Sequence, residues 1–270
     1  PVELYWDTAF YRDTGGDWFY RFLPADSMKP VKVLAAKVPG FIAEYKTLAL
    51  CVPSDKCGTS LFSWFAAEGV LARDKALRSA VAHNVETCSF ASLDIADTDG
   101  YRTGIASSIP DGVRTALEDL LDMFFSTGCS VTMFCDRVFP LTAFAGSIAK
   151  PSHGETVACI ERRGDFFTIW NIVNLHGNLF PVNSSFALVS DIEPKEDLSK
   201  NTAYLASELV RIHKFAPPQK GVFIDSLLPV EVELPRPIIL QTLRNAAPGA
   251  SDILIAETPD AALRGLAKVV

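Results

Sequence analysis

The most constraining feature of the sequence is a β-hairpin at residues 155–175, in the middle of an alternation of strands and helices. Val157 to Ile160 is a short apolar run, and Phe166 to Leu175 is rich in the aromatic and β-branched residues that suit a half-buried strand. Arg162 to Asp165 supplies the turn, because Gly164 can take a positive φ without steric cost. Each flanking half reads as several strands followed by a helix, a strand and a helix. The sequence therefore predicts an α/β protein of two lobes, with the hairpin opening the second.

Length and composition indicate a folded chain of two domains or one large one. The 270 residues are 49% hydrophobic and 21% charged, which allows a sizeable core and argues against disorder. The net charge is −7 and no cluster of Lys and Arg is present. Nucleic acid is therefore excluded as an expected partner, because its binders need a basic face.

Cysteine, histidine and aspartate spacing argues against a metal site. The six cysteines include no C-x-x-C pair and the four histidines are scattered, so no structural zinc site is predicted. Most of the cysteines lie in apolar runs, which favours buried thiols in a reducing compartment. Asp94, Asp97 and Asp99 lack the glycine and glutamate positions of a helix-loop-helix calcium site, so we interpret them as a solvated hairpin.

Membrane-spanning and targeting segments are not visible in the sequence. No apolar run approaches the roughly 20 residues that cross a bilayer, and no signal peptide is recognisable. The chain begins at Pro1, so a membrane segment beyond either end, for instance after Val270, stays open.

The first half predicts strands, an insert, and then a helix, a strand and a helix. Aromatic runs at 3–11 and 17–23 flank a hairpin turn at Asp13 to Gly16. Further strands are predicted at 31–38, 47–52, 90–95, 101–107 and 131–135. Helices are predicted at 59–68, from Arg73 to Val85, at 111–127 and at 139–149. We expect strands 101–107 and 131–135 to pair in parallel through a right-handed crossover, because a helix separates them.

The second half repeats this layout after the central hairpin. Strands are predicted at 180–189, 221–228 and 253–256, and helices at about 196–215 and at 238–246. A final helix is predicted to begin at Thr258-Pro259-Asp260, where an N-cap is followed by proline at the first helical position, and to run to Val269.

Three stretches of this layout carry a resemblance to a known family. They are the apolar strand Thr47 to Pro53; the strand, long helix, glycine, strand and small-residue helix of Tyr101 to Ala145; and the closing half, at Ala203 to Arg211, Val222 to Ile224 and Thr258 to Ala267. In order and spacing they resemble the actin-like PilM and GspL families of the type IV pilus and type II secretion assembly platforms. The resemblance covers roughly residues 45–270.

The resemblance implies a fold and a division of the chain. We expect duplicated actin-like, ribonuclease H-like lobes, with the first lobe at 1–150 and the second at 151–270. A small α+β insert in the first lobe is expected at about 54–100.

The sequence departs from the family at the positions that hold nucleotide. Nucleotide-binding actin-like proteins carry an Asp-x-Gly-x-x-(Ser/Thr) motif, in which small residues let backbone amides approach the phosphates. Here Cys159 takes the place of the aspartate and Glu161 that of the first glycine. A carboxylate there repels the anion, and the later adenosine turn, at 222–229, has no glycine. One phosphate-loop-like motif remains, at Asp13, Gly15 and Gly16.

The resemblance and its departures together imply a scaffold that does not catalyse. We expect a cytoplasmic protein at the inner face of the bacterial inner membrane, with no cofactor, metal or catalytic residue. Its expected partner is a platform subunit's cytoplasmic tail or the assembly ATPase, and a homodimer stays open. The family-like docking place is the cleft between the first lobe and the insert, with Trp64 and Phe65 as candidate anchors because aromatics dominate binding hot spots.

Two alternatives of other classes remain. An active ATPase or sugar-kinase-like enzyme of the same fold would grip phosphate at Asp13 to Gly16. A thiol hydrolase would use Cys57 as its nucleophile, although no basic partner for Cys57 is evident nearby in the sequence.

Overall fold

The computed structural model describes most of the chain in separate ranges. These are 7–12, 18–23, 31–33, 47–52, 57–81, 88–126, 128, 130–163, 166–188, 218–226, 236–249, 253–258, 261–266 and 268. The predicted helix at 196–215 and the loop at Asp13 to Gly16 lie outside them.

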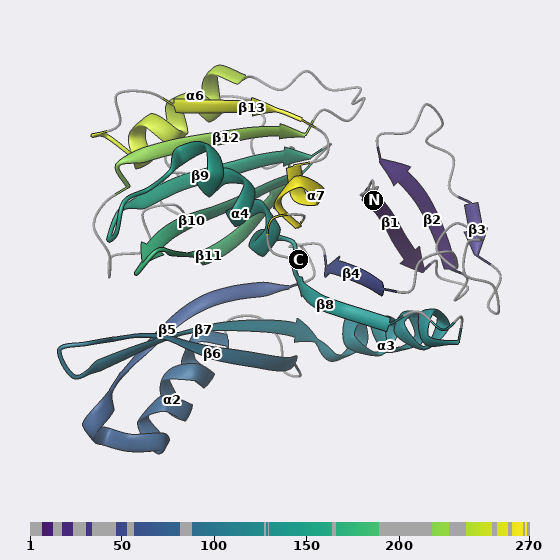
Figure 1. The fold of residues 1–270 in the computed structure, drawn as a ribbon, viewed down its shortest axis with the longest axis horizontal. Coiled ribbons are helices and arrows are strands. Elements are labelled where there is room, and N and C mark those ends of the chain that lie inside the picture. The colour runs from purple at the N-terminus through teal and green to yellow at the C-terminus, as the bar shows by residue number, and fades with distance from the viewer. Residues whose placement is uncertain are drawn as a thin grey trace.

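A five-stranded mixed sheet forms the second half of the molecule (Figure 1). Its order is β11-β10-β9-β12-β13, with bounds Thr156–Arg163 (β9), Phe166–Leu175 (β10), Asn178–Leu188 (β11), Lys220–Ser226 (β12) and Ile253–Glu257 (β13). The first three strands form an antiparallel meander, and β12 pairs in parallel with both β9 and β13. The predicted hairpin of β9 and β10 is confirmed.

Helices cover both faces of this sheet, which explains why the middle of β9 and of β12 is apolar on both sides. On one face, α6 (Arg236–Ala246) packs on Ala158 and Ile160 of β9. On the other face, α4 (Val138–Ala149) and α7 (Ala261–Leu266) pack on Val157 and Cys159. Alternate residues of β9 therefore enter two separate cores, as expected for a central strand buried on both sides.

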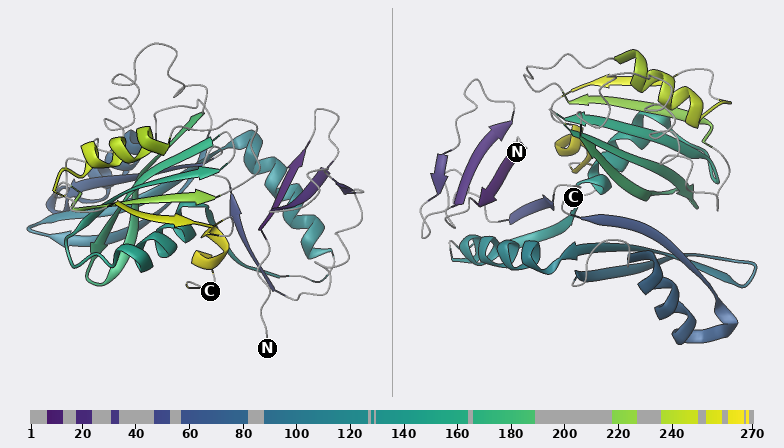
Figure 2. Two further views of the ribbon diagram at one scale, coloured as in Figure 1. Left: turned by 90° about the horizontal axis from the view of Figure 1, so that it is seen from above. Right: turned by 180° about the vertical axis from the view of Figure 1, so that it is seen from behind.

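The first half contains two small groups of strands. One is an antiparallel meander of β1 (Asp7–Arg12), β2 (Trp18–Leu23) and β3 (Val31–Val33). The other is a parallel pair of β4 (Thr47–Val52) and β8 (Ser130–Asp136). The helix α3 (Asp111–Phe125) precedes β8, and Figure 2 shows β1 to β3 on the same side of the molecule as α3.

A three-stranded antiparallel sheet with one α-helix lies between β4 and α3 in the sequence, and we call it the insert. Its order is β5-β7-β6, with bounds Gly58–Phe65 (β5), Cys88–Thr98 (β6) and Tyr101–Pro110 (β7). A 3-10 turn, η1 (Ala66–Glu68), leads into α2 (Gly69–Val81), which packs on the side of this sheet that faces away from the five-stranded sheet (Figures 1 and 2).

The turn between β6 and β7 confirms the Asp-Gly hairpin predicted from the sequence. Asp99 and Gly100 have φ of 51° and 81°, the left-handed backbone that such two-residue turns require.

Two predictions in this region were wrong. Residues 59–65 form strand β5 rather than the start of a helix, because Phe62 and Trp64 point inward at the two-residue period of a strand. Strands β7 and β8 do not pair, because β5 and β6 occupy both edges of β7, and β8 pairs with β4 instead.

The other predicted elements among the described residues are confirmed to within a few residues at their ends, and the architecture is the predicted mixed α/β one. No helix in the described ranges is long and apolar enough to cross a membrane.

Candidate functional site

Glu161 lies in a buried polar cluster at the carboxyl ends of three strands. Glu161 is 1% exposed and lies near the end of β9. The guanidinium of Arg137, just after β8, donates through Nη2 to Oε1 at 2.9 Å and through Nε to Oε2 at 3.4 Å. The hydroxyl of Ser226, the last residue of β12, donates to Oε1 at 2.8 Å. The carboxylate is thus neutralised and bonded on both oxygens by residues from two other elements.

A second ion pair lies beside the first on the parallel strands β9 and β12. Arg162 Nε donates to Asp225 Oδ1 at 2.8 Å, and the two residues are direct partners in the strand register. The backbone N–H of Thr258, after β13, donates to the Asp225 carbonyl oxygen at 2.9 Å. Ligand sites of α/β sheets lie beyond such carboxyl ends, so this edge is the candidate site of the fold.

Asp136 joins the insert to the start of α4. Asp136 is 4% exposed. Its carboxylate accepts two hydrogen bonds, from Thr59 Oγ1 at 2.8 Å and from the N–H of Val138 at 3.0 Å. The Thr59 N–H donates in turn to Ser184 Oγ of β11 at 3.1 Å. One carboxylate therefore connects β8, β5 and α4, and the insert touches the second half through Thr59.

Sequence reasoning missed Asp136, Arg137 and Ser226 as members of this cluster. A usable signal existed for the first two, since a charged pair directly after an apolar strand and before a helix marks a strand's carboxyl end. Ser226 had no such signal, because its role depends on the pairing of β12 with β9.

Cys159 is a core residue. It is fully buried between β9 and α4, and burial raises the pKa of its thiol. A neutral thiol in an apolar core does not replace an aspartate that organises magnesium.

The thiols Cys51 and Cys135 face each other across the β4–β8 pair. A hydrogen bond with Cys51, and then burial, raises the pKa of Cys135, and the nearby Cys57 adds to the shift. No group of three His, Cys, Asp or Glu side chains in the described ranges is arranged to hold a metal ion.

The two aromatic anchor candidates have different environments. Trp64 is 6% exposed and stacks on Phe62 with ring centroids 5.3 Å apart, and the Arg73 guanidinium lies 5.5 Å from the Trp64 ring. Phe65 is 39% exposed, and its ring centroid lies 5.2 Å from that of Tyr101. Thr59, near the start of β5, is bonded to Asp136. Phe65 ends the same strand, about 20 Å farther along at a rise of about 3.3 Å per residue. The accessible member of the pair is therefore at the far end of the insert.

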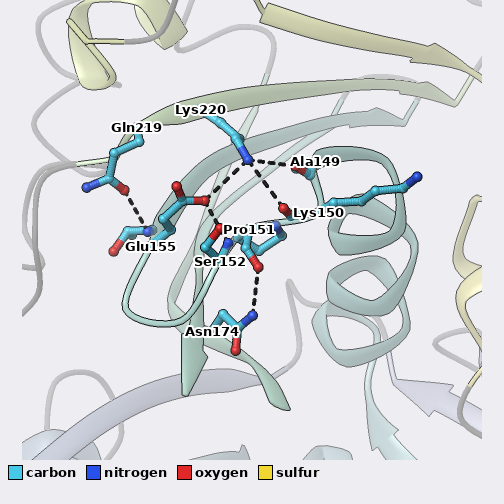
Figure 3. A network of polar contacts seen from close by, with 9 residues as sticks. Ala149, Lys150, Pro151, Ser152, Glu155, Asn174, Gln219 and Lys220 are labelled. Atoms are coloured by element: carbon cyan, nitrogen blue, oxygen red, sulfur yellow. Dashed lines mark hydrogen bonds and ion pairs between the residues drawn. The ribbon is translucent and has the colours of Figure 1, made fainter. Parts of the chain in front are cut away.

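A network at the other end of α4 fixes this helix to the sheet (Figure 3). Lys220 Nζ donates to the carbonyl oxygens of Ala149 at 3.0 Å and Lys150 at 3.3 Å, and forms an ion pair with Glu155 at 3.2 Å. A cation at a helix C-terminus is favourable for the helix dipole. The Ser152 N–H and then Lys220 hold the pKa of Glu155 below its ordinary value. The network thereby anchors the helix whose first turn follows Arg137.

Comparisons with known proteins were made on sequence and on structure. No family model matches the sequence, and no curated protein matches it. Over 94% of this chain and 90% of the other, the structure is similar to a chain of a PilM–PilN type IV pilus biogenesis complex, with a TM-score of 0.54 and 10% identity. A Bacteroides thetaiotaomicron protein of unknown function with an actin-like ATPase fold matches with a TM-score of 0.48 and 12% identity, over 97% of this chain and 95% of that one. The chain therefore has the actin-like, PilM-type fold that its sequence resembles.

Proposed function

We propose that the chain is a non-catalytic scaffold of a type IV pilus or type II secretion platform, at the cytoplasmic face of the bacterial inner membrane. It holds the cytoplasmic tail of a partner subunit, or the assembly ATPase, without hydrolysing ATP. Support for the system comes from the fold shared with PilM, which was solved in a complex with PilN.

The observation that carries the non-catalytic part is the buried Glu161–Arg137 ion pair. The family resemblance places the first phosphate-loop glycine at Glu161, and here a carboxylate fills that position with its oxygens bonded to Arg137 and Ser226. A phosphate group has the same charge sign as Glu161 and would have to separate it from Arg137. Breaking a buried pair costs on the order of 3–5 kcal/mol. A penalty of that size removes most of the affinity of a millimolar or micromolar ligand.

The strand order supports the proposed two-lobe division at 1–150 and 151–270. The second half has an antiparallel meander followed by the parallel strands β12 and β13. The first half has the meander β1 to β3 followed by the parallel pair of β4 and β8. The proposed insert, at about 54–100, falls between β4 and β8, so that it interrupts only one of the two repeats.

Co-expression with inner-membrane platform subunits tests the scaffold directly. The expected result is co-purification of this chain with one subunit's cytoplasmic tail in the absence of nucleotide, and no release of phosphate from Mg-ATP. Steady turnover of ATP that is lost in a Glu161→Lys variant would favour the alternative of an active actin-like enzyme.

A further inference from the structure

Two cysteines face each other near the ends of β4 and β8, which lie side by side (Figure 1). Cys51 and Cys135 are direct partners in the parallel register, so their side chains project from the same face of the strand pair. Cys57, just before β5, is close enough to contribute to the electrostatic surroundings of Cys135. All three are thiols in the structure and are partly exposed, which leaves them open to small reagents. We call them the thiol cluster.

The backbone at Cys51 and Cys135 has the spacing that a disulfide needs. Adjacent strands of a sheet lie about 4.7–4.9 Å apart, and the Cα atoms of bridged cysteines are usually about 4.4–6.8 Å apart. The two thiols also form a hydrogen bond with each other, which brings their sulfur atoms into contact. The sulfurs can therefore bond without any change in the register of β4 and β8.

The two facing thiols differ in reactivity. The hydrogen bond with Cys51, and then burial, raises the pKa of Cys135, so Cys135 keeps its proton. Its S–H donates to the sulfur of Cys51, and such a hydrogen bond favours the thiolate form of the acceptor. Because the thiolate is the nucleophile, Cys51 is the thiol that reacts first. Cys159, by contrast, is fully buried in the core, where a reagent does not reach it.

We propose that Cys51 and Cys135 form a reversible disulfide by exchange with a small disulfide oxidant such as oxidised glutathione. The Cys51 thiolate attacks one sulfur of the oxidant, which forms a mixed disulfide and releases one glutathione thiolate. The Cys135 thiol then gives its proton to that thiolate and attacks the Cys51 sulfur, which forms the protein disulfide and releases the second glutathione. Two protein thiols are oxidised and one oxidised glutathione is reduced to two thiols. Reversible disulfides of this kind are the usual ones in a reducing compartment.

The place of the thiol cluster in the fold gives the disulfide a structural consequence. Cys135 is followed directly by Asp136 and Arg137, which bond Thr59 of the insert and Glu161 of β9. A bond between β4 and β8 also closes the loop that contains the whole insert. Because a cross-link restricts the unfolded chain, oxidation is expected to stabilise the region where β4, β8 and the insert meet.

Disulfide mapping by mass spectrometry tests the proposal on the full chain. The native protein is equilibrated with mixtures of reduced and oxidised glutathione, its remaining thiols are alkylated after unfolding, and it is digested with trypsin. The expected product is an intramolecular Cys51–Cys135 disulfide that excess reduced glutathione reverses, with Cys159 still a thiol. The oxidised chain is expected to melt about 5–10 °C higher than the reduced chain.

Matched variants identify the bridged cysteines. Trypsin separates Cys51 from Cys57 but leaves Cys129 and Cys135 in one peptide, so the mapping is repeated on Cys129→Ser, where the same disulfide is expected. Cys135→Ser is expected to abolish both the linked peptide and the rise in melting temperature. Cys57→Ser, which alters the third member of the thiol cluster, is expected to retain both.

Several outcomes would overturn the proposal. They are a wild type that stays reduced in oxidised glutathione alone, a disulfide of Cys57 in place of the proposed pair, a glutathione adduct that persists on Cys51, and disulfide-linked dimers. A Cys51–Cys135 disulfide without a rise in melting temperature would overturn its stabilising role. The inference does not depend on the proposed function: ATP binding would end the scaffold proposal and leave the mapped disulfide standing.

Discussion

At the scale of single residues, the buried ion pair of Glu161 and Arg137 joins the end of β9 to the residue that follows β8. Burying two charges is costly, and the pair is tolerated because hydrogen bonds from Arg137 and Ser226 satisfy the carboxylate. Removing one partner leaves the other charged, buried and uncompensated.

A double-mutant cycle measures this coupling. Glu161→Gln and Arg137→Met should each lower the free energy of unfolding by about 3–5 kcal/mol, and the double variant should lose clearly less than the sum. Urea denaturation at neutral pH provides the values. Additive losses would show that the two side chains act independently.

The ion pair of Lys220 and Glu155 gives a pH dependence of known sign. The folded-state pKa of Glu155 is below its ordinary value of 4.5. Its contribution to stability is therefore fully present above about pH 4.5 and is lost as the pH falls through the lower folded-state value. The difference in unfolding free energy between the wild type and Glu155→Gln should thus shrink between about pH 7 and about pH 3. A difference that stays constant over this range would contradict the assignment.

Only part of the cluster around Glu161 could be predicted from the sequence. The resemblance assigns Cys159 and Glu161 to phosphate-loop positions from the local sequence alone, and that assignment stays a prediction. The partners of Glu161 could not be predicted, because Arg137 and Ser226 reach it from other elements through the strand pairing.

At the scale of elements, the packing of α7 on α4 depends on one glycine. A Cβ atom at Gly265 would lie 1.7 Å from the Pro140 carbonyl oxygen, which is backbone and cannot rotate away. Gly265→Ala is therefore expected to destabilise the fold by about 1–3 kcal/mol or more.

The control for that substitution is Gly249→Ala, where a Cβ would meet nothing within 4 Å. Thermal unfolding of both variants provides the comparison. An unchanged melting temperature for Gly265→Ala would show that α7 does not pack on α4 as described.

The last two aromatic residues of β5, Trp64 and Phe65, have different roles. Trp64→Ala should cost about 3–5 kcal/mol of stability, because the ring fills the insert core. Phe65→Ala should change stability far less, because its ring is 39% exposed and lies outside that core. Melting temperatures of both variants separate the two roles, and a large loss of stability in Phe65→Ala would contradict the assignment.

The same strand shows why one element was mispredicted. Leu61, Phe62, Trp64 and Phe65 fit a helical stripe as well as a strand with one face buried, and over so short a run the periodicity does not decide. Pairing with β7 over its whole length decides in favour of the strand. The long amphipathic pattern of α3 and the Asp99-Gly100 turn carried enough local information to be predicted correctly.

At the scale of the whole molecule, the order of elements was sufficient to predict an actin-like α/β fold, and the fold shared with PilM confirms it. The pairing of β8 with β4 was not predictable from neighbours along the chain, because the whole insert lies between them. We propose that this fold holds a buried ion pair at the position that the resemblance assigns to a phosphate-loop glycine.

Isothermal titration of the full chain with Mg-ATP tests this claim most directly. We predict no binding, or a dissociation constant weaker than about 1 mM, which corresponds to roughly 4 kcal/mol. Saturable binding tighter than that, weakened when Glu161 is replaced by lysine, would place ATP in the site that the ion pair is held to fill and would contradict the account.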